Sequence, residues 1–201
     1  SLLLISSISV YGENLEHLSK EFDELHPKSI YGIVKLVTEK IFENYSIVNK
    51  TDTTILRMST LYGPNKKTGH IVNLIKSINN HVSTVAYNNG NQIRDLLFVN
   101  DAARGIIQSI KKPQKGFNIF NISSAKQYKI LDIIKIIESI SKKKLPVKFS
   151  DEIPDEKRLC ADNSLAEENL DFIPKTSIED GLKITIEHFQ KNSPWLKYVF
   201  Y

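Results

Sequence analysis

The sequence predicts an α/β fold built on a parallel β-sheet. Short apolar, β-branched segments predict strands, and segments with helical periodicity separate them along the chain. Strands that alternate with helices are typical of a parallel sheet. Residues 2–6 are almost wholly apolar, which predicts a strand buried on both faces. The chain has 201 residues, 41% of them hydrophobic, enough for one or two small domains with a core.

The other elements follow from apolar periodicity and turn residues. A helix over residues 29–49 carries an apolar stripe of Ile33, Val34, Val37, Ile41 and Phe42. Asp101 is expected to cap a helix that runs through Ile110, because its carboxylate can accept amide protons of the first turn. Residues 62–65 and 88–91 are predicted turns. The remaining predicted strands are 53–58, 82–87, 96–99, 117–122 and 146–149, and the remaining predicted helices are 70–78, 128–141, 163–169 and 177–190.

Composition excludes several classes of protein. No apolar run reaches the ~20 residues of a membrane-spanning helix, and the apolar start lacks the basic region and cleavage site of a signal peptide. The net charge of +4 is spread along the chain, which is typical of a solvated surface or, alternatively, of a mild preference for phosphate-bearing ligands. No basic stripe interleaved with aromatic residues indicates nucleic-acid binding. The single cysteine, Cys160, indicates a reducing, cytoplasmic location.

The sharpest functional motif is Tyr31-Gly-Ile-Val-Lys35. Residues four apart on a helix share a face, so the phenol and the ammonium point the same way. An ordinary phenol, with a pKa near ~10, is a poor base at neutral pH, and a nearby cation stabilises the phenolate. A tyrosine tuned in this way can exchange a proton with a substrate hydroxyl. Alone, the motif also arises by chance as an exposed pair.

Ser7 strengthens the catalytic interpretation. It ends the first predicted strand, and the carboxyl ends of parallel strands open into the ligand site of a doubly wound sheet. Its hydroxyl is placed to hold the oxygen that Tyr31 deprotonates, although a serine at a strand end is otherwise a simple turn residue. The order Ser7, Tyr31, Lys35 favours a catalytic set.

Motifs along nearly the whole chain resemble one family. Residues 5–12 (Ile-Ser-Ser-Ile-Ser-Val-Tyr-Gly) and 29–36 (Ser-Ile-Tyr-Gly-Ile-Val-Lys-Leu) resemble the catalytic strand and helix of the NAD-dependent epimerase/dehydratase family, within the extended short-chain dehydrogenases/reductases. Residues 56–64 are similar to the family's next strand and turn, and residues 90–101 to its nucleotide-sugar loop. Residues 117–123 are similar to its last sheet strand, and residues 161–166 and 175–182 to its C-terminal helices.

The resemblance implies a partial Rossmann-type, doubly wound parallel sheet that holds only the C-terminal strands, together with a small α/β substrate-binding domain. Residues 1–65 and 95–123 would belong to the dinucleotide-binding domain, and residues 66–94 and 124–201 to the substrate-binding domain. The glycine-rich turn that holds the cofactor pyrophosphate in this family would then lie before Ser1.

The resemblance also implies catalytic and cofactor roles. Tyr31 would be the acid or base, Lys35 would tune it and hold the nicotinamide ribose of NAD or NADP, and Ser7 would bridge to the sugar hydroxyl. Ser59 falls where the family places a residue near the nicotinamide.

The implied substrate is a nucleoside-diphosphate sugar. Thr60 stands where many members have an asparagine facing the diphosphate, and Arg94 falls on the arginine that clamps it. The alternative for Arg94 is a surface ion pair with Asp95. Tyr87 is expected against the nucleotide base, or otherwise in the core.

Many members have a second substrate-binding arginine at the position where this chain has Glu152. Lys157 or Arg158 is expected to supply the missing positive charge. Cys160 and Trp195 are interpreted as packing residues. His26 and His188 lack the spacing of metal ligands.

The two residues after Ser7 narrow the reaction. Family dehydratases have an Asp-Glu pair there, and the related decarboxylases keep the glutamate, whereas this chain has Ile8 and Ser9. A 4-epimerase or a 4-keto-reductase is therefore expected. The alternatives are a non-catalytic dinucleotide-binding relative, which would be expected to lose Tyr31 or Lys35, and a truncated product. The complete protein is expected to be a homodimer, joined by the helix that holds Tyr31 and by the one before it.

Overall fold

A three-stranded parallel sheet forms the centre of one half of the molecule. The computed structural model describes residues 1–14, 16–80, 83–153 and 156–191, so Val82 and Trp195, which the sequence assigned to a strand and to packing, lie outside the described residues. The sheet has the order β1-β2-β7, with β1 Leu2–Ser7, β2 Thr53–Met58 and β7 Phe117–Ile122. Its register aligns Ser7 with Met58 and Met58 with Ile122, so the three strands end level with one another.

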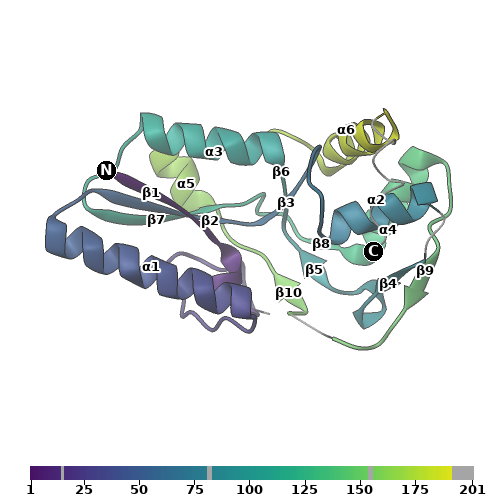
Figure 1. The fold of residues 1–201 in the computed structure, drawn as a ribbon, viewed down its shortest axis with the longest axis horizontal. Coiled ribbons are helices and arrows are strands. Elements are labelled where there is room, and N and C mark those ends of the chain that lie inside the picture. Colours follow the sequence, from purple (N-terminus) through teal and green to yellow (C-terminus); the bar gives the residue numbers. More distant parts are fainter. Residues whose placement is uncertain (15, 81–82, 154–155, 192–201) are drawn as a thin grey trace.

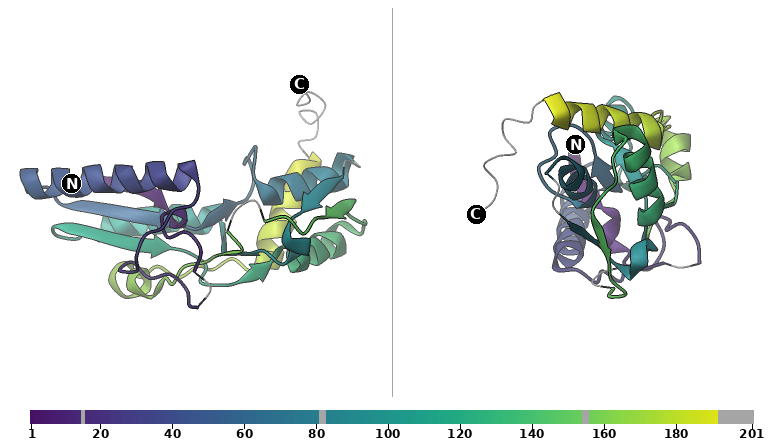
Figure 2. Two further views of the ribbon diagram at one scale, coloured as in Figure 1. Left: turned by 90° about the horizontal axis from the view of Figure 1, so that it is seen from below. Right: turned by 90° about the vertical axis from the view of Figure 1, so that its right-hand side faces the viewer.

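Helices cover both faces of this sheet (Figure 1). The long helix α1 (Ile30–Asn49) lies against β1 and β2 on one face. On the other face, α3 (Val99–Lys111) and α5 (Ser164–Leu170) pack on β2 and β7 through a cluster that contains Leu56, Phe120 and Leu170. Figure 2 shows α1 and α5 on opposite sides of the strands. This layered arrangement with parallel strands confirms the predicted α/β class.

A second, separate core fills the other half of the molecule. Helices α2 (His70–Asn80), α4 (Ile130–Ser141) and α6 (Ile178–Lys191) enclose buried side chains such as Leu74, Ile133 and Leu182. Short strands complete this half and join it to the first. They are β3 (Thr60–Tyr62) with β6 (Leu96–Phe98), β4 (Thr84–Ala86) with β9 (Val147–Phe149), and β5 (Ile93–Arg94) between β8 (Tyr128–Lys129) and β10 (Arg158–Leu159).

Two short 3₁₀ turns lie between these elements, η1 (Ile8–Val10) after β1 and η2 (Asn88–Gly90) after β4. The predicted division into two domains remains a prediction, although the position of α5 on the sheet groups that helix with β7 in space.

Two expectations from the sequence were wrong in detail. β1 is an edge strand of the described sheet, with Leu2 36% and Ile5 38% exposed, so it is not buried on both faces. Asp101 does not cap α3, whose N-cap residue is Phe98. Instead, the Asp101 carboxylate accepts a hydrogen bond from the Thr176 amide at 2.9 Å, because the chain before α6 passes over the start of α3.

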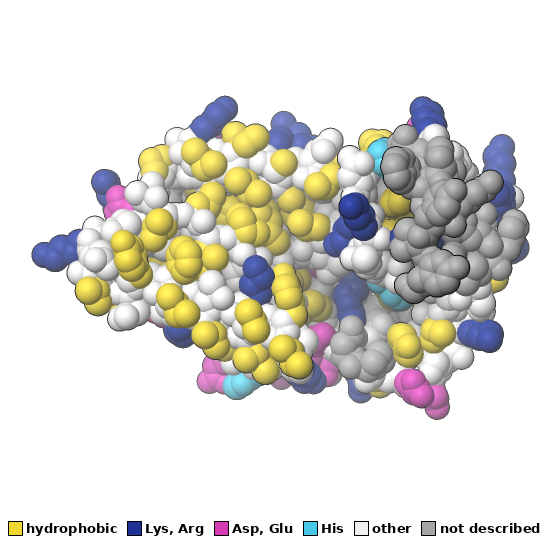
Figure 3. Space-filling model, in the orientation of Figure 1, with side chains coloured by type: hydrophobic (Ala, Val, Ile, Leu, Met, Phe, Trp, Pro, Cys, Tyr) yellow, Lys and Arg dark blue, Asp and Glu magenta, His cyan; other side chains and the backbone are white. Residues whose placement is uncertain are grey.

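The apolar stripe of α1 lies on the side of the helix that faces away from the sheet. Ile33, Val34, Val37 and Ile41 are each about half exposed, because the face of α1 that meets the sheet carries Gly32, Glu39 and Ser46. Figure 3 shows hydrophobic side chains gathered on the half of the surface where α1 lies. An exposed apolar patch of this kind is typical of an interaction surface.

Three further properties bear on ligands and location. Within the described ranges, no helix combines the length and apolar character needed to cross a membrane. The same residues contain no cluster of three or more metal-binding side chains. Cys160 is a buried free cysteine whose thiol pKa is raised to about 12 by burial.

Candidate active site

A cleft of about 340 Å³ opens at the carboxyl end of the central sheet. It is bounded by the ends of β1 and β2, by the segment that continues into β3, and by the first turns of α1. Five of the residues expected to form the site line it, namely Ser7, Tyr31, Lys35, Ser59 and Thr60. Segments far apart in the sequence are therefore brought together here, because parallel strands end at one edge of a sheet.

The start of α1 fixes the tyrosine and the lysine in this cleft. Ser29 is the N-cap of the helix, and its hydroxyl accepts a hydrogen bond from the Gly32 amide at 3.1 Å. The Lys35 ammonium donates to the Ile5 carbonyl at 2.9 Å and lies 5.7 Å from the centre of the Tyr31 ring. Tyr31 is 56% exposed, so its phenol faces open space beside the lysine. The shared face that the four-residue spacing predicts is thus present.

Ser7 is held by the turn that comes after β1. Its hydroxyl accepts from the Ser9 amide at 3.2 Å and donates to the Ser9 hydroxyl at 3.1 Å, capping η1. Ile8, the neighbour that replaces an acidic residue of the dehydratases, is buried. The serine pair therefore presents hydroxyl groups, and no carboxylate, at this end of β1.

Gly32 is needed for the close approach of α1 to that turn. A Cβ atom at Gly32 would lie 2.6 Å from the Ser9 carbonyl oxygen and 2.9 Å from the Pro27 Cβ. We expect Gly32→Ala to lower the free energy of unfolding, because overpacking costs about 1–3 kcal/mol, more than the ~1 kcal/mol that alanine gains in a helix. Urea unfolding of the full-length protein measures this, with Val48→Ala on the exposed side of α1 as the control. Equal stability of wild type and Gly32→Ala would contradict the close approach.

Lys66 is a cleft residue that the sequence analysis missed. Its ammonium lines the cleft near Thr60 and donates to the Leu61 carbonyl at 2.7 Å. Burial lowers the pKa of this ammonium. The only signal in the sequence is a lysine pair shortly after the Gly63-Pro64 turn, which is indistinguishable from a solvated surface cluster.

The other three predicted substrate residues do not line the cleft. Arg94 lies on β5, partly buried, and its guanidinium donates to the Ile93 carbonyl at 3.0 Å. Tyr87 is partly buried at the N-cap of η2. Arg158, on β10, is buried and donates to the Gln127 side chain at 3.0 Å and to the His17 carbonyl at 2.6 Å.

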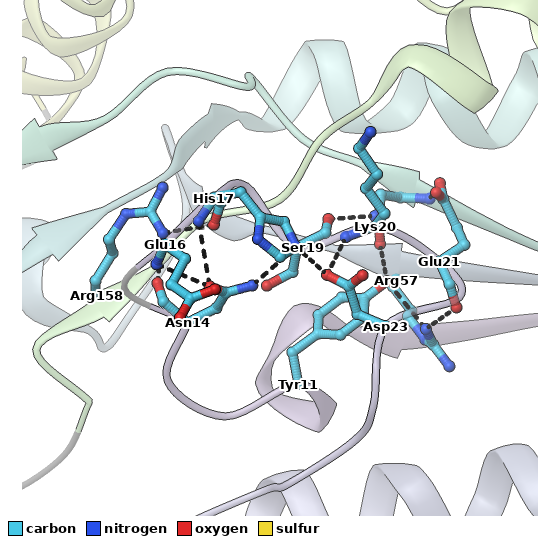
Figure 4. Close-up of polar contacts among 11 residues, drawn as sticks. Tyr11, Asn14, Glu16, His17, Ser19, Lys20, Glu21, Asp23, Arg57 and Arg158 are labelled. Atoms are coloured by element: carbon cyan, nitrogen blue, oxygen red, sulfur yellow. Dashed lines mark hydrogen bonds and ion pairs between the residues drawn. The ribbon is translucent and has the colours of Figure 1, made fainter.

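The Arg158 guanidinium also donates to the Asn14 carbonyl, and Figure 4 shows it reaching the backbone of the loop between Tyr11 and Asp23. In this arrangement Arg158 joins β10 to the loop that comes after Ser7.

Asp95 is fully buried between the two halves, not at the surface as the ion-pair alternative required. One carboxylate oxygen accepts hydrogen bonds from the Ser124 amide at 2.9 Å and from the Ser124 hydroxyl at 2.7 Å. Burial raises the pKa of this carboxyl from 3.8 to about 6, and the hydrogen bonds from Ser124 only partly oppose that rise.

The fold and the cleft together define a Rossmann-like α/β protein with a Tyr-x-x-x-Lys pair and a serine at the carboxyl edge of its sheet. The family model described as the NAD dependent epimerase/dehydratase family matches residues 1–123. The chain belongs to this family.

Relatives and solved structures agree with the family. The chain is 34% identical over 184 residues to an uncharacterised UDP-glucose epimerase, YtcB, of Bacillus subtilis, covering 90% of this chain and 58% of that protein. It is 30% identical to a UDP-glucuronate 4-epimerase of Thermodesulfobacterium geofontis, covering 98% and 61%.

Among solved structures, the UDP-glucuronic acid 4-epimerase of Bacillus cereus in complex with UDP-glucuronic acid and NAD superposes with a TM-score of 0.89. That protein is 31% identical, and the match covers 94% of this chain and 61% of the other. The chain thus spans less than two thirds of the length of these relatives.

Proposed function

We propose that the full-length protein is an NAD(P)-dependent nucleotide-sugar 4-epimerase or 4-keto-reductase. The observation that carries the proposal is the meeting of Ser7, Tyr31 and Lys35 in one cleft at the carboxyl edge of the sheet. Relatives that this chain resembles are UDP-sugar epimerases, and several of their structures hold NAD. The cofactor proposed here is NAD or NADP.

The donors in the cleft fit a nicotinamide cofactor. The Lys35 ammonium has three N–H groups and donates one to the Ile5 carbonyl, and the others are suited to ribose hydroxyls. Ser59, the residue expected beside the nicotinamide, also lines the cleft. When bound, the cofactor accepts a hydride from the sugar carbon and gives it back.

Residues of this chain transfer the proton of the sugar hydroxyl. Tyr31, as phenolate, accepts the proton of the C4 hydroxyl while the C4–H bond breaks, and a keto sugar results. The Lys35 cation is placed to stabilise that phenolate, and the Ser7 hydroxyl, rotated away from Ser9 when substrate binds, donates to the same sugar oxygen and keeps it in line. In an epimerisation, Tyr31 would then give the proton back to the same oxygen as hydride is restored to the opposite face of the sugar carbon. A reductase performs the return half alone.

Elimination of water from the sugar is disfavoured by the groups beside Ser7. Ile8 carries no ionisable group, and the Ser9 hydroxyl is engaged with Ser7. A dehydratase needs an acid and a base at these positions, so the proposal is restricted to epimerisation and reduction.

We further propose that Thr60, Arg94, Arg158 and Tyr87 serve the nucleoside diphosphate of the substrate in the full-length protein. Thr60 lines the cleft beside Lys66, which adds a cation on the side where phosphate oxygens would lie. Of the two arginines, Arg94 is proposed as the clamp, because it falls at the position of the diphosphate-binding arginine in the family resemblance. The Arg158 guanidinium holds Gln127 and two loop carbonyls.

The partner of α1 is proposed to be a second copy of the protein. Its half-exposed apolar residues Ile33, Val34, Val37 and Ile41 form a face that a helix of an identical subunit can cover. A cytoplasmic homodimer without nucleic-acid or membrane partners is the assembly proposed.

Arg94→Ala tests the substrate class. We expect it to weaken binding of a nucleoside-diphosphate sugar about tenfold or more while leaving NAD binding unchanged, because charge-assisted hydrogen bonds contribute roughly 1.5–3 kcal/mol each. Arg94→Lys keeps the charge but not the planar fork, so it should recover only part of the loss. Calorimetry of the full-length protein with UDP-, dTDP-, GDP- and CDP-sugars measures both. Unchanged affinity in Arg94→Ala, or no binding of any of these sugars to wild type, would remove the support for this substrate class.

A further inference from the structure

A buried ion pair lies directly behind the cleft, on the same helix as the tyrosine and the lysine. Tyr31, Lys35 and Glu39 occur at four-residue intervals and share one face of α1. Tyr31 and Lys35 line the cleft, whereas Glu39 is only 2% exposed. Its partner is Arg57 on β2, which is also 2% exposed.

The geometry of this pair is bidentate. Arg57 donates from Nη2 to Glu39 Oε2 at 2.7 Å and from Nε to both carboxylate oxygens at 3.1 and 3.2 Å. The Ser6 hydroxyl donates to the same carboxylate. Glu39 is therefore joined to β1 at the residue next to Ser7, and to β2 one residue before that strand ends.

The remaining contacts of Arg57 extend to the loop behind Ser7. Its Nη1 donates to the Tyr11 phenol oxygen at 2.9 Å and to the Glu21 carbonyl at 3.1 Å, as Figure 4 shows. Tyr11 in turn donates to Asn121 on β7 at 2.7 Å. Burial acts to lower the pKa of the Arg57 guanidinium, but the hydrogen bonds and charges of its partners, Glu39 first, outweigh burial and raise that pKa.

A buried ion pair is a poor device for stability alone. Removal of two charges from water costs about as much as their attraction returns, and well-packed apolar replacements are often neutral or stabilising. The pair does fix the position of α1 relative to β2, because a bidentate guanidinium–carboxylate contact sets both the distance and the orientation of the two side chains. Two hydrogen bonds, one helical turn apart, join α1 to β1: one from Lys35 to the Ile5 carbonyl and one from Ser6 to Glu39. Together they oppose both rotation and sliding of the helix against the strand.

We propose that Glu39 and Arg57 are positioning residues that hold the Tyr31 phenol and the Lys35 ammonium in register with Ser7. This inference rests on the proposed function, since it assigns the pair a part in that reaction. A misplacement of reacting groups by 1 Å can cost on the order of 10²-fold in rate. Loss of the pair therefore acts on turnover through the geometry of the cleft, without any contact between Glu39 and the substrate.

The test compares turnover with folding in the full-length protein. Glu39→Gln removes the ion pair, and the double variant Glu39→Met/Arg57→Met replaces it by apolar side chains that avoid an uncompensated buried charge. Glu43→Gln is the matched control, because it breaks the exposed pair between Lys40 and Glu43 on the same helix. Each protein is assayed for kcat and KM with NAD and a nucleotide sugar, and for stability by urea unfolding.

We expect Glu39→Gln to lower kcat about 10- to 100-fold with KM changed by no more than about twofold. The double variant should approach wild-type stability but keep the low kcat, and Glu43→Gln should match wild type in both measurements. A double variant with wild-type kcat would overturn the proposal. So would a decrease in Glu39→Gln activity that is explained fully by a smaller folded fraction.

Crystal structures separate this inference from the proposed function. If the wild-type protein turns over no nucleotide sugar, the proposed function fails. The position of Tyr31 in the crystal structures then still tests whether Glu39 and Arg57 position it. We expect the Tyr31 hydroxyl to shift relative to Ser7 Oγ in the double variant but not in Glu43→Gln. An unshifted tyrosine in the double variant would overturn the positioning role whatever the activity.

Discussion

Tyr31→Phe should reduce turnover of the full-length protein by about 10²–10⁴-fold, the range that general acid–base catalysis contributes. The substitution removes a single oxygen from a side chain that is 56% exposed, so the fold should be unaffected. Substrate binding should also persist, because the residues proposed to bind the diphosphate do not include Tyr31. The effect should therefore appear in kcat, with the dissociation constant of the nucleotide sugar nearly unchanged.

Tyr45→Phe is the matched control for this prediction. Tyr45 lies on the same helix, is 49% exposed and does not line the cleft, so its hydroxyl should be dispensable. Steady-state kinetics of both variants, with calorimetry of substrate binding, provide the comparison. A Tyr31→Phe enzyme that keeps more than about a tenth of the wild-type rate would mean that another group moves the proton.

The second large effect is expected on stability and concerns Asp95. The pKa of the Asp95 carboxyl is about 6 in the folded protein, compared with 3.8 in an unfolded chain. At a pH between these two values, the folded state therefore holds a proton that the unfolded state has released. Its contribution to stability is therefore fully present below about pH 4 and is lost as the pH rises through 6. A shift of about two units corresponds to roughly 3 kcal/mol.

Asp95→Asn removes this titration and resembles the protonated acid in shape. We expect the free energy of unfolding of wild type, minus that of Asp95→Asn, to fall by roughly 2 kcal/mol between pH 4 and pH 7. Urea unfolding across that range measures the difference, in which most other titrating groups cancel. A difference that stays constant, or that rises with pH, would show that the Ser124 hydrogen bonds outweigh the burial of Asp95.

Much of the fold follows from local patterns in the sequence. The bounds of β2 and β7 match the predicted strands, because short segments rich in apolar or β-branched residues and bounded by turn residues favour strands. The cleft could also be predicted in part, since the spacing of Tyr31 and Lys35 and the place of Ser7 after a strand are local features. Ser59 and Thr60 were expected from the family resemblance alone, and all five residues line one cleft.

Features set by long-range contacts were not predictable in the same way. The apolar stripe of α1 could be read from the sequence, but its direction could not, because the face of the helix against the sheet is made of Gly32, Glu39 and Ser46. No periodicity distinguishes the two faces when the buried one carries an ion pair. Arg57 reads in the sequence as an interruption of a β-branched strand, and its role depends on a residue 18 positions earlier.

The proposal that Ser7, Tyr31 and Lys35 act on C4 of a nucleotide sugar is tested most directly by tracking that carbon. The full-length protein is incubated with its cofactor and with UDP-glucose or UDP-glucuronic acid deuterated at C4, and the sugar is monitored by NMR. We predict a product inverted at C4 that keeps its deuterium, or, for a reductase, reduction of a 4-keto nucleotide sugar by the reduced cofactor. A protein that binds the cofactor by calorimetry, yet changes C4 in neither assay across UDP-, dTDP-, GDP- and CDP-sugars, would contradict the account.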